Sequence, residues 1–411
     1  MNSHSLDSPD TPDRAGTPDT ARLPNPPSPV AGSPSPTAPT DTEPAEHGAL
    51  LRYGWDTRVA DAFAPYEDEG LLPARIVRVD RGLCDAVTAA GVLRAGTAPV
   101  ATADPTRTVC TGDWAAVHPR GGPGGMPEVR ALLPRRTAFV RSTSTHRSEG
   151  QVLAANVDFA LIAVSLAAEL ELPRVERFTA LAWTSGATPL IVLTKADLVA
   201  DPATLGQLAA DVEESAPGVQ VLTVSAAEGE GLDALTAVVA GSTCVLLGQS
   251  GAGKSTLVNA LMGEDVQDVR AIRDSDGKGR HTTTTRDLLV LPESAGGGVL
   301  IDTPGLRGVG LWAAEDGVSS TFAEIEALAA ECRFHDCGHE SEPGCAVLGA
   351  VADGGLPQRR LDSYRKLLRE NARLAARTDA RLRAEQKRRF KEMMAVGRHN
   401  AERKRGPRRK P

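Results

Sequence analysis

The sequence has few aromatic residues and no long apolar run. Phe, Trp and Tyr together make up 3% of the 411 residues, although hydrophobic residues as a whole reach 41%. No stretch approaches the roughly 18 consecutive apolar residues that a membrane-spanning helix requires. We therefore predict a chain that has no membrane association and contains enough apolar residues for real cores.

The amino-terminal end also lacks an export signal. Residues 1–47 are dominated by Pro, Ser, Thr, Asp and Ala, and they contain no apolar segment typical of a signal peptide. This composition predicts a disordered tail. Six cysteines in a long chain without such a signal indicate a reducing, cytoplasmic location, where a cysteine cluster binds metal more often than it forms disulfides.

Positive charge is scarce except at the carboxyl-terminal end. The formal net charge is −7, but residues 381–411 contain thirteen Lys/Arg and only three Asp/Glu. A basic tail on an acidic body predicts contact with a polyanion, of which nucleic acid is the commonest in the cytoplasm. The alternative is a solvated, frayed terminus.

Short strands separated by glycine are predicted between residues 70 and 140. They cover residues 75–79, 84–88, 91–94, 113–118 and 128–133. Their number and spacing suit a small Greek-key β-barrel such as the OB-fold, which often binds oligonucleotides, although another small sandwich would give the same pattern.

The pattern changes to an α/β domain over residues 150–310. Apolar runs alternate with helical segments; the runs are residues 159–164, 189–193, 219–224, 243–247, 287–291 and 299–302. Such alternation predicts a mostly parallel sheet covered on both faces. Residues 311–380 are predicted to form a small helical domain that contains a Cys/His-rich segment, and the basic tail follows at 381–411. We therefore predict a multi-domain fold.

A glycine-rich loop follows the predicted strand at 243–247 and opens a helix, which is the setting of a phosphate-binding P-loop. Backbone N–H groups of such a loop surround phosphates, Lys254 would reach the β- and γ-phosphates, and the Ser255 hydroxyl would ligate Mg²⁺. The predicted nucleotide-binding residues of this loop are Gly248, Gln249, Ser250, Gly251, Ala252, Gly253, Lys254, Ser255 and Thr256.

Two further motifs predict selection of guanine over adenine. The sequence Thr194-Lys195-Ala196-Asp197 follows a predicted strand, and the Asp197 carboxylate can accept hydrogen bonds from guanine N1–H and the 2-amino group together. The stem of Lys195 can lie along the base. Ser225 and Ala226 follow the next strand, where backbone can meet guanine O6. Thr194 stands where Asn is more usual, so its contribution should be smaller or different.

The loops around the last predicted strands should complete the Mg²⁺ and γ-phosphate site. Asp302 can hold Mg²⁺ through water, and the Gly305 N–H can meet the γ-phosphate. One threonine of residues 282–285 should complete the Mg²⁺ shell, and Thr284 is our candidate. Leu306 stands where many GTPases place the water-orienting Gln, so hydrolysis should be slow; His281 is the remaining candidate catalytic residue, and its alternative is a loop histidine without that role.

The order of these motifs is itself informative. The base-reading residues at 194–197 and 225–226 precede the phosphate-binding loop at 248, and nothing after Gly305 resembles a second base-reading motif. The sheet must therefore be a circular permutation of the usual arrangement.

Three cysteines and a histidine lie within fourteen residues: Cys332, Cys337, His339 and Cys345. Four such ligands saturate tetrahedral Zn²⁺ and leave no open position for catalysis, so the site would be structural. His335 is a substitute ligand, but its spacing would leave His339 unused.

Together these motifs resemble the RsgA family of circularly permuted GTPases over about residues 70–375. The resemblance implies an OB-fold barrel, a permuted GTPase domain with Mg²⁺ and GTP or GDP, and a helical zinc domain that docks on the 30S ribosomal subunit and its 16S rRNA. It also implies slow GTP hydrolysis that the subunit stimulates during late maturation, with release of the protein and of assembly factors. We expect a monomer.

Two other functions remain open from the sequence. One is a constitutive RNA-binding module whose nucleotide only stabilises the fold. The other is an ATP-dependent P-loop kinase, which would prefer ATP and so contradict the expected role of Asp197.

Overall fold

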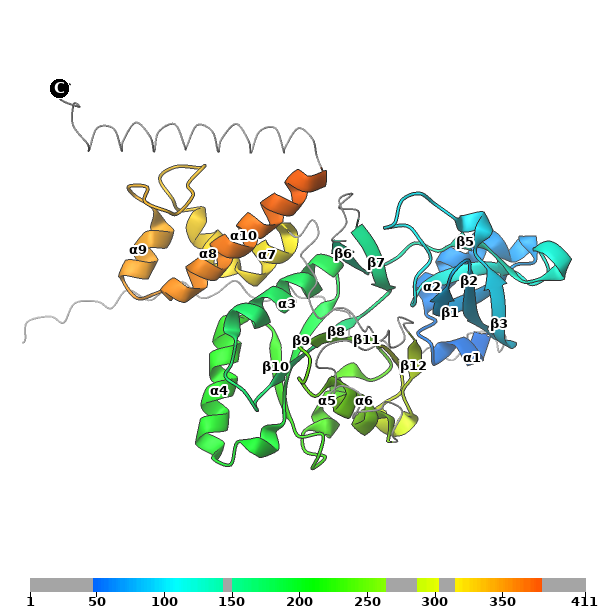
Figure 1. Ribbon diagram of the computed structural model, residues 1–411, viewed down its shortest axis with the longest axis horizontal. Coiled ribbons are helices and arrows are strands. Elements are labelled where there is room, and N and C mark those ends of the chain that lie inside the picture. The colour runs from blue at the N-terminus through cyan, green and yellow to red at the C-terminus, as the bar shows by residue number, and fades with distance from the viewer. Residues whose placement is uncertain (1–46, 143–149, 264–286, 303–314, 379–411) are drawn as a thin grey trace, which may run out of the picture. The chain divides into compact units, whose positions relative to one another are not determined.

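The computed structural model describes residues 47–142, 150–263, 287–302 and 315–378 (Figure 1). Their strands form a closed five-stranded barrel, a six-stranded sheet and a two-stranded sheet. The predicted tails and the loops at residues 264–286 and 303–314 lie outside the described residues. Among the helices described, none is long and apolar enough to cross a membrane.

The barrel has the strand order β1-β2-β3-β5-β4. Neighbouring strands pair antiparallel, except that β3 meets β5 through one parallel pair, Gly96 with Glu128. The prediction of a small five-stranded barrel is confirmed. Its strands are β1 (Leu72–Asp80), β2 (Leu83–Thr88), β3 (Gly91–Gly96), β4 (Trp114–His118) and β5 (Glu128–Leu132), with the short 3-10 helices η3 (Ala98–Val100) and η4 (Pro123–Gly125) in its loops.

Small side chains fill the barrel. Alternate residues of β1 and β2 face one buried cluster, as the two-residue period of a strand requires. The cluster consists of Ala74, Ile76, Cys84, Ala86, Ala95, Ala115, Val117 and Val129. A narrow barrel can close around such residues without aromatic side chains, which agrees with the low aromatic content of the chain.

Two short helices before the barrel pack against Trp114 on β4, and the sequence did not predict them. They are α1 (Gly48–Leu51) and α2 (Thr57–Phe63), followed by the 3-10 helix η2 (Ala64–Glu69). The ring of Trp55 lies edge-on to that of Trp114, with 5.3 Å between centroids. Leu50 and Phe63 belong to the same buried cluster. These helices are too short to be stable alone, so this contact stabilises them.

The six-stranded sheet has the order β10-β9-β8-β11-β13-β12. All neighbours are parallel except β12 and β13. The strand before the phosphate-binding loop, β11, lies in the middle of the sheet. Three strands of the sheet, β8, β9 and β10, precede it along the chain, as the predicted permutation requires. The strands are β8 (Phe159–Ser165), β9 (Thr188–Thr194), β10 (Gln220–Val224), β11 (Thr243–Gly248), β12 (Leu288–Val290) and β13 (Val299–Ile301).

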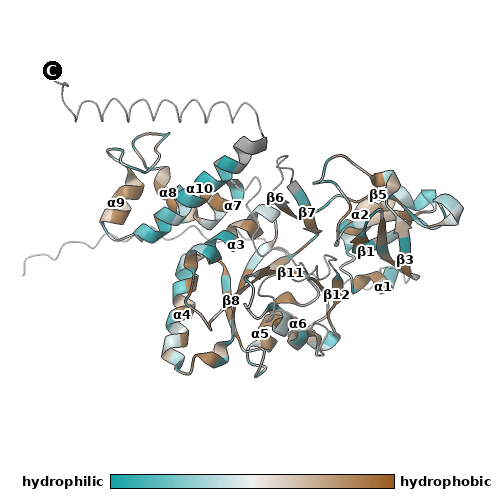
Figure 2. Ribbon diagram, viewed as in Figure 1, coloured by the Kyte–Doolittle hydropathy of each residue, from teal (hydrophilic) through white to brown (hydrophobic). Residues whose placement is uncertain are grey.

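Helices cover both faces of this sheet, because consecutive strand residues point to opposite sides. Ile162 of β8 packs in one cluster with α3 and α4, whereas Leu161 packs in a second cluster with α5 and α6. Figure 2 shows the hydrophobic residues along the strands. The helices are α3 (Leu172–Ser185), α4 (Pro202–Ser215), α5 (Leu232–Val239) and α6 (Lys254–Met262), and the 3-10 helices are η5 (Ala196–Leu198) and η7 (Glu293–Ala295).

Two antiparallel strands join the barrel to this sheet along the chain. They are β6 (Ala138–Ser142) and β7 (Gly150–Ala155). The sequence did not predict this pair. Its buried residues Phe139 and Leu153 belong to the cluster under α3.

Within residues 315–378, four helices follow the sheet: α7 (Glu315–Thr321), α8 (Ala323–Ala329), α9 (Ala346–Ala352) and α10 (Gln358–Thr378). They share the buried cluster of α3, to which Phe322 and Tyr364 contribute. At Gly317, an added Cβ would lie 2.0 Å from Thr184 Oγ1 on α3, so α7 lies very close to that helix.

A buried charge network also joins α3 to α10. Arg360 is 2% exposed, and its guanidinium donates to the carboxylates of Glu176 at 3.0 Å and Glu324 at 2.6 Å. It also donates to the carbonyl oxygens of Ser215 and Thr321 at 2.7 and 2.6 Å. The helical segment is therefore held to the α3 and α4 side of the sheet by specific polar contacts as well as by apolar packing.

Candidate functional site

The predicted phosphate-binding loop lies between β11 and α6. Gly248 has a φ of 138°, and Gly251 and Gly253 have φ values of 79° and 78°. A side chain is strained at such angles, and a Cβ on Gly248 would lie 2.5 Å from the carbonyl oxygen of Ala163. The loop therefore depends on glycine, as a cradle of backbone N–H groups for an anion does.

The lysine of the loop folds over it. Lys254 Nζ donates to the carbonyl oxygen of Gly248 at 2.9 Å and also to that of Gln249. Its ammonium group therefore lies above the loop, within reach of a bound phosphate. Ser255 and Thr256 occupy the first turn of α6 and are half-buried.

Thr194 ties the base-reading strand to this loop. Its hydroxyl donates to the carbonyl oxygen of Ala252 at 2.8 Å, and the carbonyl oxygen of Val164 lies 3.3 Å away. The next residue, Lys195, has a φ of 61°, and its Nζ donates to Gly251 at 2.8 Å. A threonine therefore links β9 to the loop by a side-chain hydrogen bond; the sequence predicted a contribution that is smaller than that of Asn or different from it.

The predicted guanine-reading carboxylate is held by a neighbouring strand. Ser225 Oγ donates to Asp197 Oδ1 at 2.6 Å. Asp197 itself is exposed in the structure, whereas Ser225 is fully buried and Ala226 is half-buried. This hydrogen bond fixes one carboxylate oxygen and leaves the rest of the carboxylate free to accept donors from a base.

The strand order brings these groups together. Thr194 pairs with Val224 of β10 on one side and with Ser165 of β8 on the other, and Gly248 pairs with Ala163. Parallel strands end at the same edge, so residues separated by more than fifty positions meet there.

Some predicted residues are not placed. Asp302 directly follows β13, and its N–H donates to the carbonyl oxygen of Asp287 at 3.0 Å. His281, Thr284 and Gly305 lie outside the described residues. Their predicted roles in catalysis, Mg²⁺ ligation and γ-phosphate contact stay predictions.

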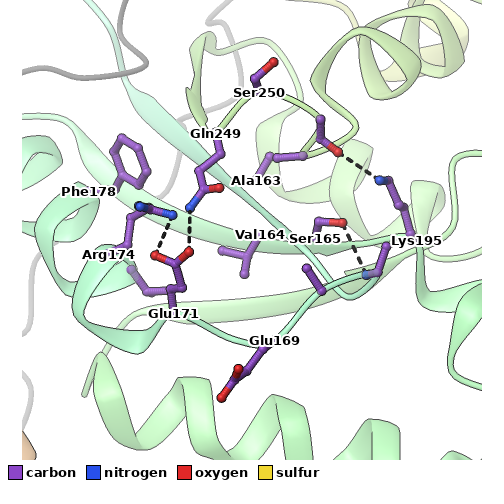
Figure 3. Close-up of a pocket in the computed structure, with 15 residues that line it drawn as sticks. Ala163, Val164, Ser165, Glu169, Glu171, Arg174, Phe178, Lys195, Gln249 and Ser250 are labelled. Atoms are coloured by element: carbon purple, nitrogen blue, oxygen red, sulfur yellow. Dashed lines mark hydrogen bonds and ion pairs between the residues drawn. The ribbon is translucent and has the colours of Figure 1, made fainter. Parts of the chain in front are cut away.

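A cavity of about 200 Å³ adjoins the phosphate-binding loop (Figure 3). Glu171, just before α3, accepts a hydrogen bond from Gln249 Nε2 at 3.4 Å and pairs with Arg174 at 2.5 Å. No local sequence pattern predicts either charged residue, because only the strand order brings the segment after β8 next to the loop. They place a fixed charge pair beside the nucleotide loop.

The four predicted metal ligands come together in the described helical segment. Their ligand atoms all lie within 4.8 Å of one another. The Sγ atoms of Cys332 and Cys345 are 3.8 Å apart, and His339 Nδ1 lies 3.6 and 3.4 Å from them. A tetrahedral ion bonded at about 2.3 Å to sulfur and about 2.0 Å to nitrogen has S–S edges of about 3.8 Å and S–N edges of about 3.5 Å. The cluster can therefore hold a tetrahedral metal ion.

Local structure shapes this cluster. Cys345 is the N-cap of α9, with its sulfur 3.4 Å from the N–H of Leu348, and His339 has a φ of 56°. The Glu342 carboxylate accepts the N–H groups of Ser341 and Gly338, both at 2.9 Å. These backbone donors lower the pKa of Glu342 to about 2. Glu342 stabilises the ligand loop, a role that the sequence analysis missed.

Comparison with known proteins identifies close relatives. The RsgA GTPase family profile matches residues 132–312. A small ribosomal subunit biogenesis GTPase RsgA from Streptomyces coelicolor is 68% identical over 362 residues, which cover 88% of this chain and 97% of that protein. A protein of the same name from Opitutus terrae is 43% identical over 356 residues, covering 84% and 95%.

Two solved structures share the fold. YjeQ from Thermotoga maritima matches with a TM-score of 0.54 and 23% identity over 73% of this chain and 98% of that one. YloQ, described as a circularly permuted GTPase, matches with a TM-score of 0.52 and 22% identity, covering 73% and 94%.

Proposed function

Because the chain belongs to the RsgA family of small ribosomal subunit biogenesis GTPases and hydrolyses GTP, we propose that it acts in late maturation of the 30S subunit. Hydrolysis is slow in the isolated protein, the subunit accelerates it, and GDP formation releases the protein and other assembly factors. The protein works as a cytoplasmic monomer that contacts 16S rRNA.

One set of contacts supports GTP as the nucleotide in this proposal. The Asp197–Ser225 pair and the Thr194–Ala252 hydrogen bond connect a base-reading carboxylate to a phosphate-binding loop. Guanine would donate N1–H and its 2-amino group to Asp197, whereas adenine would leave the carboxylate without these donors. This arrangement supports GTP rather than ATP as substrate and disfavours the kinase alternative.

Different residues of the chain have different roles in GTP hydrolysis. On binding GTP, Lys254 exchanges its loop carbonyls for phosphate oxygens and stabilises the charge that develops on them. Ser255 would ligate Mg²⁺ directly and Asp302 would hold it through water, and the ion would supply positive charge to the phosphates. His281 orients the attacking water on the subunit, because Leu306 stands where many GTPases place the glutamine that does so.

The Cys/His cluster holds one structural Zn²⁺. Three sulfur ligands and one imidazole are the donors that tetrahedral zinc prefers, and their separations fit it. Zinc organises the segment between α8 and α9, so the helices that follow can dock on the subunit. In the sequence, only residues 303–314 separate Asp302 from α7, so the nucleotide site is covalently linked to the proposed docking region.

A rate measurement tests the proposal. GTP hydrolysis is followed with the protein alone, with purified 30S subunits and with 50S subunits, and with the Lys254→Ala variant as control. We expect strong stimulation by 30S only. Equal rates with both subunits would contradict the role assigned to the small subunit.

Subunit binding tests the release step. Cosedimentation with 30S particles should be stronger with a non-hydrolysable GTP analogue than with GDP. Equal binding in both states would instead favour a constitutive RNA-binding module. In that case Lys254→Ala would retain the cellular role of the protein.

A further inference from the structure

A second cavity lies between α2 and the segment that follows β5. Its volume is about 180 Å³, and its wall contains Arg58, Arg135 and Arg136 together with Trp114 and Asn156. No acidic residue lines it, and none of its residues belongs to the nucleotide loop or the Cys/His cluster. The other lining residues, Val59, Ala62, Leu133 and Pro134, are apolar. Three arginines around one small cavity call for a physical reason, because like charges repel at short range.

The three arginines differ in how far they are already neutralised. The guanidinium of Arg135 already has partners within the protein. It donates to both oxygens of Asp113, at 2.6 and 2.8 Å, and to two backbone carbonyls. Arg136 pairs with Asp56 through one nitrogen, Nη1. Arg58 is exposed and makes no hydrogen bond or ion pair with any residue that the structure describes. Arg58 and the remaining N–H groups of Arg136 are therefore available to a ligand.

Buried donors without partners lie next to the same cavity. Trp114 is 2% exposed, and its indole N–H has no hydrogen-bond partner among the described residues. Arg75 is fully buried with its guanidinium 5.0 Å from the Trp114 ring centre, and it donates to the carbonyl oxygen of Asn156 at 3.2 Å. Its Nε and Nη1 have no partner within the same described part of the chain.

The charge of Arg75 is not balanced by direct contact. No carboxylate forms an ion pair with it among the described residues; Asp158 and Asp113 act only at longer range. Burial lowers the pKa of Arg75 to about 10, so the group remains charged at neutral pH. A buried cation without a paired anion is costly, and a nearby bound anion would offset that cost.

We propose that this cavity binds a phosphate group, with Arg58 and Arg136 as donors to its oxygens and the Trp114 indole N–H as the third donor. Guanidinium groups match phosphate geometry and bind it through two parallel hydrogen bonds. The cavity is smaller than the roughly 300 Å³ at which drug-sized ligand sites begin, so it takes the phosphate rather than a whole nucleotide. The phosphate comes either from a small molecule or from an RNA backbone.

Indole NMR signals test this site in the full chain. The sequence contains four tryptophans, so ¹⁵N-tryptophan labelling gives four indole N–H signals, and Trp114→Phe identifies the relevant one. GDP and Mg²⁺ are kept in excess to occupy the nucleotide loop. Inorganic phosphate and a single-stranded RNA hexamer are then titrated separately, at an ionic strength held constant with KCl.

We expect a saturable shift of the Trp114 signal with phosphate or with the hexamer. The Kd should rise at least about tenfold in Arg58→Ala and in Arg136→Ala, since each loses a charge-assisted hydrogen bond. Arg81→Ala, at an exposed arginine outside the cavity, is the matched control and should bind as the unmodified chain does. Arg58 is exposed, so its loss does not threaten folding.

Two results would overturn the site: a response indistinguishable from that of chloride, or an unchanged Kd in Arg58→Ala. The two titrations distinguish the sources of phosphate. If the hexamer saturates the site at a lower concentration of phosphate groups than inorganic phosphate does, the ligand is an RNA backbone. If only inorganic phosphate saturates the site, the ligand is a small molecule. Either result supports the site, and neither depends on whether the 30S subunit stimulates hydrolysis.

Discussion

Replacing Arg360 with methionine should loosen the helical segment from the sheet. Methionine keeps much of the apolar stem that packs near Phe322, whose ring lies 4.2 Å from the guanidinium carbon of Arg360. It removes the hydrogen bonds to Glu176, Glu324 and two backbone carbonyls. The Glu176 carboxylate, which is fully buried, then loses its most buried cationic partner.

The contacts of Glu176 determine how much unfolding free energy is lost in Arg360→Met. Removing one partner of a buried ion pair costs about 3–5 kcal/mol. Glu176 would still accept from Arg359 at 2.9 Å and from the Ser363 hydroxyl, so the remaining charge is partly compensated by hydrogen bonds. We therefore expect a loss near the lower end, about 3 kcal/mol in the free energy of unfolding.

Urea unfolding followed by the helical circular dichroism signal measures this loss. Arg359→Met is the matched control, because Arg359 contacts the same Glu176 oxygen but its side chain is 35% exposed. In this variant Glu176 keeps its more buried partner Arg360, so we expect a loss of at most about 1 kcal/mol. Similar losses in the two variants, or a loss below about 1 kcal/mol in Arg360→Met, would refute the reasoning. The double variant with Glu176→Gln should be less destabilised than Arg360→Met, because no buried charge is left unpaired.

Three further changes have expected outcomes. Thr194→Val removes the hydroxyl that binds the Ala252 carbonyl and should weaken GDP binding about fivefold to tenfold in a fluorescent-nucleotide titration, whereas Thr194→Ser should restore it. Gly317→Ala places a methyl group against Thr184 Oγ1 and should lower the unfolding temperature by several degrees in calorimetry, unlike alanine at the unhindered Gly349. Removing the metal with a chelator, or by Cys345→Ser, should lower the helical circular dichroism signal and leave nucleotide binding intact; unchanged helix content would argue against a structural ion.

The sheet and the nucleotide loop could be predicted because their signals are local. Each strand of the sheet is a short apolar run, and Lys254 and Asp197 each follow such a run. Parallel strands end at one edge, so the motif positions also predicted which residues would meet. The cluster of Cys332, Cys337, His339 and Cys345 could also be predicted, because these four residues lie close together in the sequence.

Other features depend on distant contacts and were not predicted. Leu50 of α1 and Phe63 of α2 are buried only through the cluster that they form with Trp114, which lies about fifty residues beyond α2 along the chain. Arg360 and Glu176 appear in the sequence as ordinary charges on amphipathic helices, where solvent exposure is the usual outcome. Their burial follows from the packing of α10 on α3, and no local pattern carries that information.

The permuted strand order has a consequence for synthesis of the chain. A growing polypeptide completes β8, β9 and β10 first, and β11 joins the other edge of β8 only afterwards. Until then the nascent sheet has an open edge at what becomes its centre, and open edges invite pairing with other chains. The guanine-reading residues are translated before the phosphate loop exists. A newly made molecule therefore cannot hold GTP until β11 has been inserted, so translation order itself delays its entry into the nucleotide cycle.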